Sequence, residues 1–90
     1  MNVTKLSKFK QLESCFTHAY KTEKAFVVVM VEIEGQEGYE IIINPYINIL
    51  EKLEYYRKTY DDDLNHKHAK GIKIVSWCSL DEIRELEINE

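Results

Sequence analysis

Apolar residues fill both the odd and the even positions of the segment 25–33, which reads AFVVVMVEI. Successive side chains of a β-strand point to opposite faces of its sheet, so a strand with this pattern needs cover on both faces. The pattern therefore predicts a central strand. Either helices flank this strand on both sides, or one face of its sheet is buried against another chain.

Two further segments have apolar residues at three- and four-residue spacing, which is typical of helices with one buried side. The first predicted helix runs from about Thr4 to Tyr20. The second runs from Pro45 to about Leu64. Its start is indicated by Asn44, whose side chain can accept hydrogen bonds from first-turn amides, and by Pro45, whose missing N–H costs nothing there.

Two more strands complete the predicted sheet. The loop 35–38 has a glycine at each end, where positive φ is tolerated, and closes a hairpin between the central strand and a second strand, Tyr39–Ile43. A third strand spans Ile72–Cys78. Ser79 and Glu82 then form a capping box, which predicts a last helix ending at about Leu86.

The resulting order, α-β-β-α-β-α, predicts an α+β fold, a two-layer α/β sandwich with a central β-hairpin. With the most apolar strand in the centre, the three-stranded antiparallel sheet has the strand order 2-1-3. One face is predicted to carry Val27, Val29, Val31, Ile33, Ile41, Ile43, Ile72 and Ile74. The other face is predicted to carry Phe26, Val28, Met30, Ile42, Val75 and Trp77.

The second of these faces is the candidate interface. If both long helices pack on the first face, the second face is left open, and a contiguous apolar patch on a protein surface marks an interaction site. We therefore expect this face to mediate binding of a protein partner or formation of a homodimer.

Composition narrows the class of protein. At 90 residues, with 44% apolar and 31% charged residues, the chain is expected to form one globular domain, residues 1–90. The net charge of −4 argues against direct binding to nucleic acid, which needs clustered Lys and Arg. The sequence has neither an apolar stretch long enough to span a membrane nor the apolar core of a signal peptide, so we expect a cytoplasmic protein.

The cysteines and the amino-acid composition lead to two expectations, about the redox state of the thiols and about the source of the gene. Cys15 and Cys78 are expected to be free thiols in a reducing compartment. Frequent Ile, Lys, Glu, Asn and Tyr, with little Pro or Gly, indicate an AT-rich gene. Such a gene is typical of a low-GC bacterium, or of a prophage or another mobile element in it.

Acidic residues gather around the predicted hairpin, at Glu32, Glu34, Glu37 and Glu40. They can set the polarity of a protein partner by attracting a basic surface. They can also imitate the phosphate spacing of nucleic acid, which makes an inhibitor of a basic protein an alternative function. A third interpretation is that they keep an exposed hairpin from aggregating.

Carboxylates and imidazoles that can hold a metal ion occur together at Asp61, Asp62, His66 and His68. They suggest a metal-dependent or dimer-site enzyme as a further alternative. Consecutive aspartates at a helix end point in different directions, so a solvated helix end is the competing interpretation. The sequence contains no phosphate-binding glycine loop, nucleophile elbow or zinc-type cysteine pattern and implies no cofactor. It favours a small acidic interaction module without catalytic activity.

Overall fold

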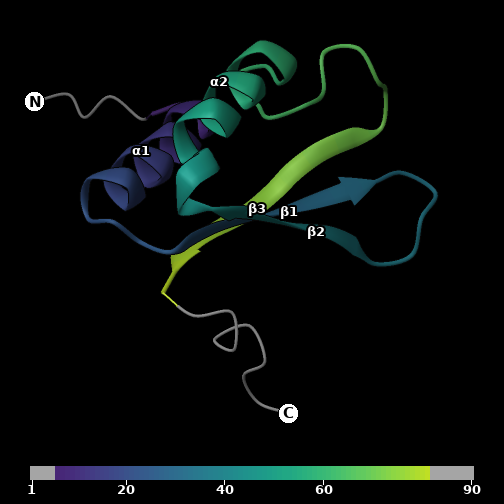
Figure 1. Ribbon diagram of the computed structural model, residues 1–90. Helices are drawn as coiled ribbons and strands as arrows, with labels where there is room; N and C mark the ends of the chain where they lie inside the picture. Colours follow the sequence, from purple (N-terminus) through teal and green to yellow (C-terminus); the bar gives the residue numbers. More distant parts are fainter. Residues whose placement is uncertain (1–5, 82–90) are drawn as a thin grey trace, which may run out of the picture.

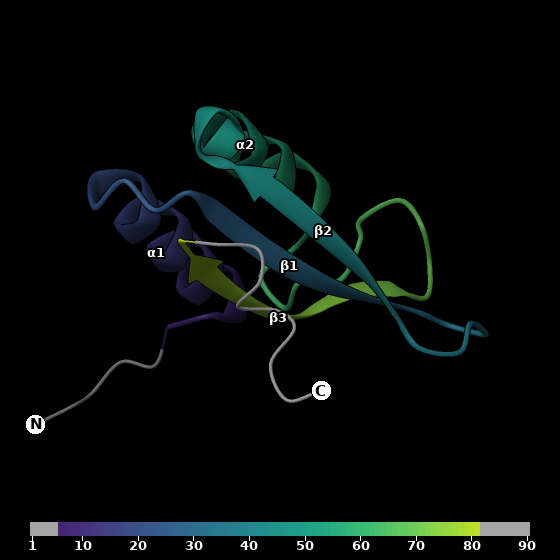
Figure 2. The same cartoon turned by 60° about the horizontal axis from the view of Figure 1, so that its bottom comes forward.

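The computed structural model describes residues 6–81, which form two helices on one side of a three-stranded antiparallel sheet (Figure 1). The elements are α1 (Lys8–Lys21), β1 (Phe26–Ile33), β2 (Tyr39–Pro45), the short 3₁₀ turn η1 (Tyr46–Asn48), α2 (Ile49–Thr59) and β3 (Ile72–Leu80). The strands lie in the order β2-β1-β3, with β1 in the centre (Figure 2). The predicted α+β sandwich and the strand order 2-1-3 are confirmed.

The hydrophobic core lies between the two helices and one face of the sheet. The rings of Phe16 on α1 and Tyr56 on α2 meet edge to face, with centroids 5.6 Å apart, above the β1 residues Val27 and Val29. All four side chains are almost completely buried. Each large apolar side chain buried in this way contributes about 1.5–3 kcal/mol. The remaining members of the core are Phe9, Leu12, Ala19, Val31, Ile49, Leu53, Tyr60, Leu64 and Ile74.

One buried polar side chain, Asn44, fixes the end of β2 to this core. Its side-chain nitrogen donates to the Val27 carbonyl at 3.1 Å and to the Tyr56 hydroxyl at 3.5 Å, and the residue is 2% exposed. Burial raises the pKa of the Tyr56 hydroxyl, which keeps it neutral. Because the Asn44 amide is used inside the core, it does not cap a helix.

The predicted helix from Pro45 to Leu64 is therefore wrong at both ends. The Tyr46 N–H donates to the Ala25 carbonyl at 2.8 Å, which continues the β1–β2 ladder, and α2 begins only at Ile49. At the other end α2 stops at Thr59, and Tyr60 takes an extended conformation and pairs with His66. Strand pairing and burial of the Asn44 side chain thus override the local sequence signals for a helix in these segments.

The strand β3 contains a β-bulge. Met30 pairs with Ser76, whereas the next residue of β1, Val31, pairs with Ile74, so Val75 is an extra residue. A bulge of this kind shifts the alternation of side chains between the two faces. Residues before and after Val75 therefore follow opposite parities along β3.

This bulge overturns the predicted positions of two side chains. Trp77 pairs with Val29 and packs against the core, so it lies on the helix-covered face rather than on the open one. Val75 lies at the outer edge of the sheet, beside Lys8 and Gln11 of α1. Trp77 reaches the face that carries Val28 only where it lines a hollow beside Cys78, and Val75 has no partner in β1.

The register of the hairpin overturns the predicted faces of β2 as well. An even number of residues lies between the paired Glu32 and Tyr39, so odd positions of one strand face even positions of the other. As a result Ile42 packs against the core, while Ile41 and Ile43 lie on the opposite face. The sequence-based prediction had these three residues reversed.

Predictions near the chain ends are only partly covered by the described residues. The first helix begins at Lys8, where the Ser7 side chain accepts a hydrogen bond from the Lys10 N–H at 3.1 Å, and its predicted start at Thr4 lies outside the described residues. Ser79 and Leu80 belong to β3 instead of opening a helix. The rest of the predicted last helix, to Leu86, also lies outside the described residues.

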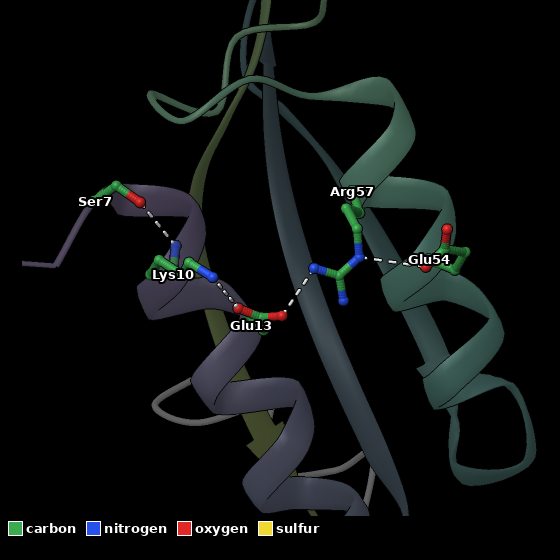
Figure 3. A network of polar contacts seen from close by, with 5 residues as sticks. All are labelled: Ser7, Lys10, Glu13, Glu54 and Arg57. Atoms are coloured by element: carbon green, nitrogen blue, oxygen red, sulfur yellow. Dashed lines mark hydrogen bonds and ion pairs between the residues drawn. The ribbon is translucent and has the colours of Figure 1, made fainter.

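A network of polar contacts joins the two helices at their exposed side (Figure 3). Glu13 of α1 accepts from Arg57 of α2 at 2.8 Å and also pairs with Lys10 at 3.3 Å, and Arg57 reaches Glu54 at 3.2 Å. The Arg57 guanidinium lowers the pKa of the Glu13 carboxyl below its ordinary value of 4.5. Exposed pairs of this kind contribute about 0.2–1 kcal/mol each, so the apolar core remains the main source of helix packing.

We expect Glu13→Gln to lower the free energy of unfolding at neutral pH by about 0.2–1 kcal/mol. Because the pKa of Glu13 is lowered in the folded state, this stabilisation is present above the ordinary pKa and is lost as the pH falls through the folded value. Urea unfolding at about pH 7 and about pH 3 measures the difference. Glu54→Gln, which removes an Arg57 contact within α2 alone, is the matched control. A loss from Glu13→Gln that is equally large at both pH values would contradict the assignment.

Candidate functional site

The face of the sheet turned away from α1 and α2 is largely apolar, and we call it the open face (Figure 1). The pairing registers place Val28 between Ile43 and Cys78, and Met30 between Ile41 and Ser76, with all these side chains on the same face. The apolar part of the open face consists of Phe26, Val28, Met30, Tyr39, Ile41, Ile43, Pro45, Cys78 and Leu80.

Exposure is greatest on the β2 side of the open face. Tyr39 is 54% exposed, Ile41 47% and Ile43 41%, whereas Val28 in the central strand is 4% exposed. A shallow hollow of about 80 Å³ lies beside them, lined by Val28, Met30, Ile41, Ser76, Trp77 and Cys78. The row on β2 is thus the part of the face that another molecule can reach most fully.

The predicted interface residues divide between the two sides of the sheet. Phe26, Val28 and Met30 lie on the open face, as expected from their parity. Ile42 and Trp77 belong to the helix-covered face. The members that sequence reasoning missed are Tyr39, Ile41, Ile43, Pro45, Cys78 and Leu80. The one signal that could have identified the β2 residues was the even number of residues between the paired ends of the hairpin.

The four glutamates do not form a single acidic surface. Glu32 lies at one end of the open face and pairs with Lys73 at 3.8 Å. Glu40 pairs with Val31 in the register, which places it on the helix side, and accepts from Gln36 at 3.0 Å. A surface that follows regular phosphate spacing therefore receives no support from this arrangement.

The other two glutamates belong to the hairpin loop. The Glu34 N–H donates to the Gly71 carbonyl at 2.7 Å, and the Glu34 side chain lies so close to Gly71 that a Cβ there would meet its carboxylate oxygen at 2.7 Å. Gly71 also has φ +85, a conformation that glycine adopts without strain. Glu37 is exposed in the same loop. The base of the hairpin is thus fixed against the loop that precedes β3.

The candidate metal ligands Asp61 and Asp62 make hydrogen bonds that stabilise the loop after α2. The Asp61 carboxylate accepts from the backbone N–H groups of Asp63 and Asn65, both at 2.9 Å. These bonds support a turn in which Leu64 has φ +67 and is buried in the core. Asp62 is exposed, and its carbonyl accepts from the Phe9 N–H at 3.1 Å.

The two histidines are also occupied by local contacts. His66 Nδ1 accepts from the N–H groups of His68 and Ala69, both at 3.0 Å. The two imidazole rings are 6.2 Å apart and nearly perpendicular. Within residues 6–81, no three His, Cys, Asp or Glu side chains are grouped so that they could hold a metal ion. The geometry therefore gives the metal-dependent alternative no support.

We expect Asp61→Ala to lower the free energy of unfolding by about 1 kcal/mol in the presence of a metal chelator, because two backbone N–H groups lose their acceptor. Asp61→Asn is the matched control, since an asparagine side chain retains an acceptor for the same turn. Urea unfolding measures both variants. If Asp61→Ala reduces stability only when divalent metal is added, the side chain is a metal ligand and not a turn residue.

Comparison with known proteins gives no match: no family model fits the sequence, and no curated protein or solved structure is significantly similar to the chain. Neither of the two helices within residues 6–81 has the length and apolar character that a membrane span requires.

Proposed function

We propose that this protein is a small, non-enzymatic interaction module that binds protein through the β2 side of its open face. The observation that carries the proposal is the row of half-exposed side chains Tyr39, Ile41 and Ile43 beside the apolar hollow at Val28 and Met30. Removing such a continuous apolar surface from water favours association. We infer that it acts as an acidic accessory protein in the cytoplasm.

The chemistry of the surface favours a protein partner. Aromatic and aliphatic side chains form its centre, and the charged pair of Glu32 and Lys73 lies at its border. An apolar centre with a polar rim is the usual anatomy of a protein–protein interface. The net charge of −4 disfavours the phosphate backbone of nucleic acid as the ligand.

A photoreactive residue can test whether this surface contacts protein. We expect p-benzoylphenylalanine at position 43 to form protein adducts on irradiation, in the purified protein or in an extract of its source organism. The matched control is the same residue at position 50, because Leu50 on α2 is 50% exposed and Ile43 is 41% exposed. Gel electrophoresis and mass spectrometry identify the adducts.

Adducts at position 43 that are absent or much weaker at position 50 support the proposal. Equal labelling at both positions would show that adduct formation follows exposure alone, and absence of adducts at position 43 would show that the surface has no protein partner under these conditions. Either of these results would overturn the proposed function.

A further inference from the structure

The outer edge of β2 presents backbone groups that no part of the described chain uses. The Tyr46 N–H donates to the Ala25 carbonyl, so Ala25 and Tyr46 form a hydrogen-bonded pair of the ladder between β1 and β2. In an antiparallel ladder such pairs recur at every second residue of each strand. They include Val27 with Asn44 and Val29 with Ile42. The even residues of β2 therefore bond to β1, and the odd residues turn their N–H and C=O groups outward.

These outward groups belong to the same residues as the exposed apolar row. Tyr39, Ile41 and Ile43 point their side chains onto the open face and their backbone groups away from β1. Within residues 6–81, β2 is an edge strand, and no backbone hydrogen bond connects these three residues to another element. Pro45 is the next odd residue of β2 after Ile43, and because it has no N–H it ends the row of outward donors.

The other edge of the sheet, formed by β3, is covered over its first half and interrupted by a bulge. The Leu64 carbonyl accepts from the Ile74 N–H at 3.0 Å, and the His66 N–H donates to the Ile72 carbonyl at 2.8 Å, so the first half of β3 is covered. The bulge at Val75 then interrupts the strand. Covering segments and bulges are the devices by which sheets avoid pairing with other chains. Between Tyr39 and Ile43, β2 has neither of them, and its one charged residue there, Glu40, lies on the helix side of the sheet.

We propose that β2 pairs antiparallel with β2 of a second copy of this chain, with the two-fold axis passing at Ile41. This inference rests on the proposed function, for which it names the partner. In this register Ile41 faces Ile41 of the second copy, and Tyr39 faces its Ile43. Each outward N–H of the three residues then finds a C=O of the second copy, and aromatic and β-branched side chains lie side by side on the open face.

The distribution of charge suits this arrangement. Antiparallel pairing carries the two hairpin loops, with Glu34 and Glu37, to opposite ends of the dimer, so the acidic groups are kept apart. Glu40 faces Ile42 of the second copy, and like charges do not meet across the strands. Because the contact uses the β2 edge of both copies, it closes into a symmetric dimer and does not continue into a fibre.

Sedimentation velocity across a concentration series tests the pairing. We expect the wild-type protein to dimerise and Ile41→Pro, which removes an outward N–H that the monomer does not use, to weaken the dimer by about tenfold or more. Ile41→Ala is the matched control, because it shortens the same side chain but keeps the N–H. We expect it to weaken the dimer much less than Ile41→Pro.

A second measurement needs no substitution and covers the case in which the proline variant fails to fold. Amide hydrogen exchange of the wild-type protein is followed by NMR at low and high concentration. We expect Tyr39, Ile41 and Ile43 to become protected as the concentration rises, while Glu40 and Ile42, already bonded to β1, change little.

Three results would overturn the inference. The first is a wild-type monomer at every concentration. The second is equal weakening of the dimer by Ile41→Pro and Ile41→Ala, which indicates packing of open faces without edge pairing. The third is the absence of alternating amide protection in β2. If a wild-type monomer still forms adducts from position 43 with another protein, the proposed function stands and only the identity of the partner is wrong.

Discussion

The central strand β1 is apolar on both faces, and this constraint governs the rest of the structure. Val27 and Val29 on one face are covered completely by α1 and α2, which lie on the same side of the sheet (Figure 1). Val28 on the other face is 4% exposed although it is not part of the helix-covered core, because its neighbours in the sheet shield it. The helices thus cover one face of the sheet and, within residues 6–81, leave the face that carries Val28 without a helix (Figure 1).

The buried Asn44 links the core to the proposed binding surface. Its amide bonds to the Val27 carbonyl and the Tyr56 hydroxyl, which holds the end of β2 against the core. With that end fixed, β2 stays extended as far as Pro45, and Ile41 and Ile43 keep both their side chains and their backbone edge accessible. A buried amide that lacks partners costs about 1–3 kcal/mol, so the strand and the core are specified together.

The fold class was predictable from the sequence, but the sides of the sheet were not. Local patterns identified the helices and strands, and the two-sided run at β1 placed that strand in the centre. The face of each β2 residue depends on the hairpin register, and the face of Trp77 depends on the bulge at Val75. Both features are decided by strand pairing, as is the use of Asn44 in the core. Which backbone groups of β2 point away from β1 could likewise be deduced only once the hydrogen-bonded pairs of the two strands were known.

The most direct test of the account is an intermolecular NOE experiment on a mixture of two differently isotope-labelled samples of the protein. The account predicts contacts between β2 of one copy and β2 of the other, with Glu40 next to Ile42 of the second copy and Tyr39 next to its Ile43. Intermolecular contacts that arise only from α1 or α2, or the absence of any contact from β2, would contradict it.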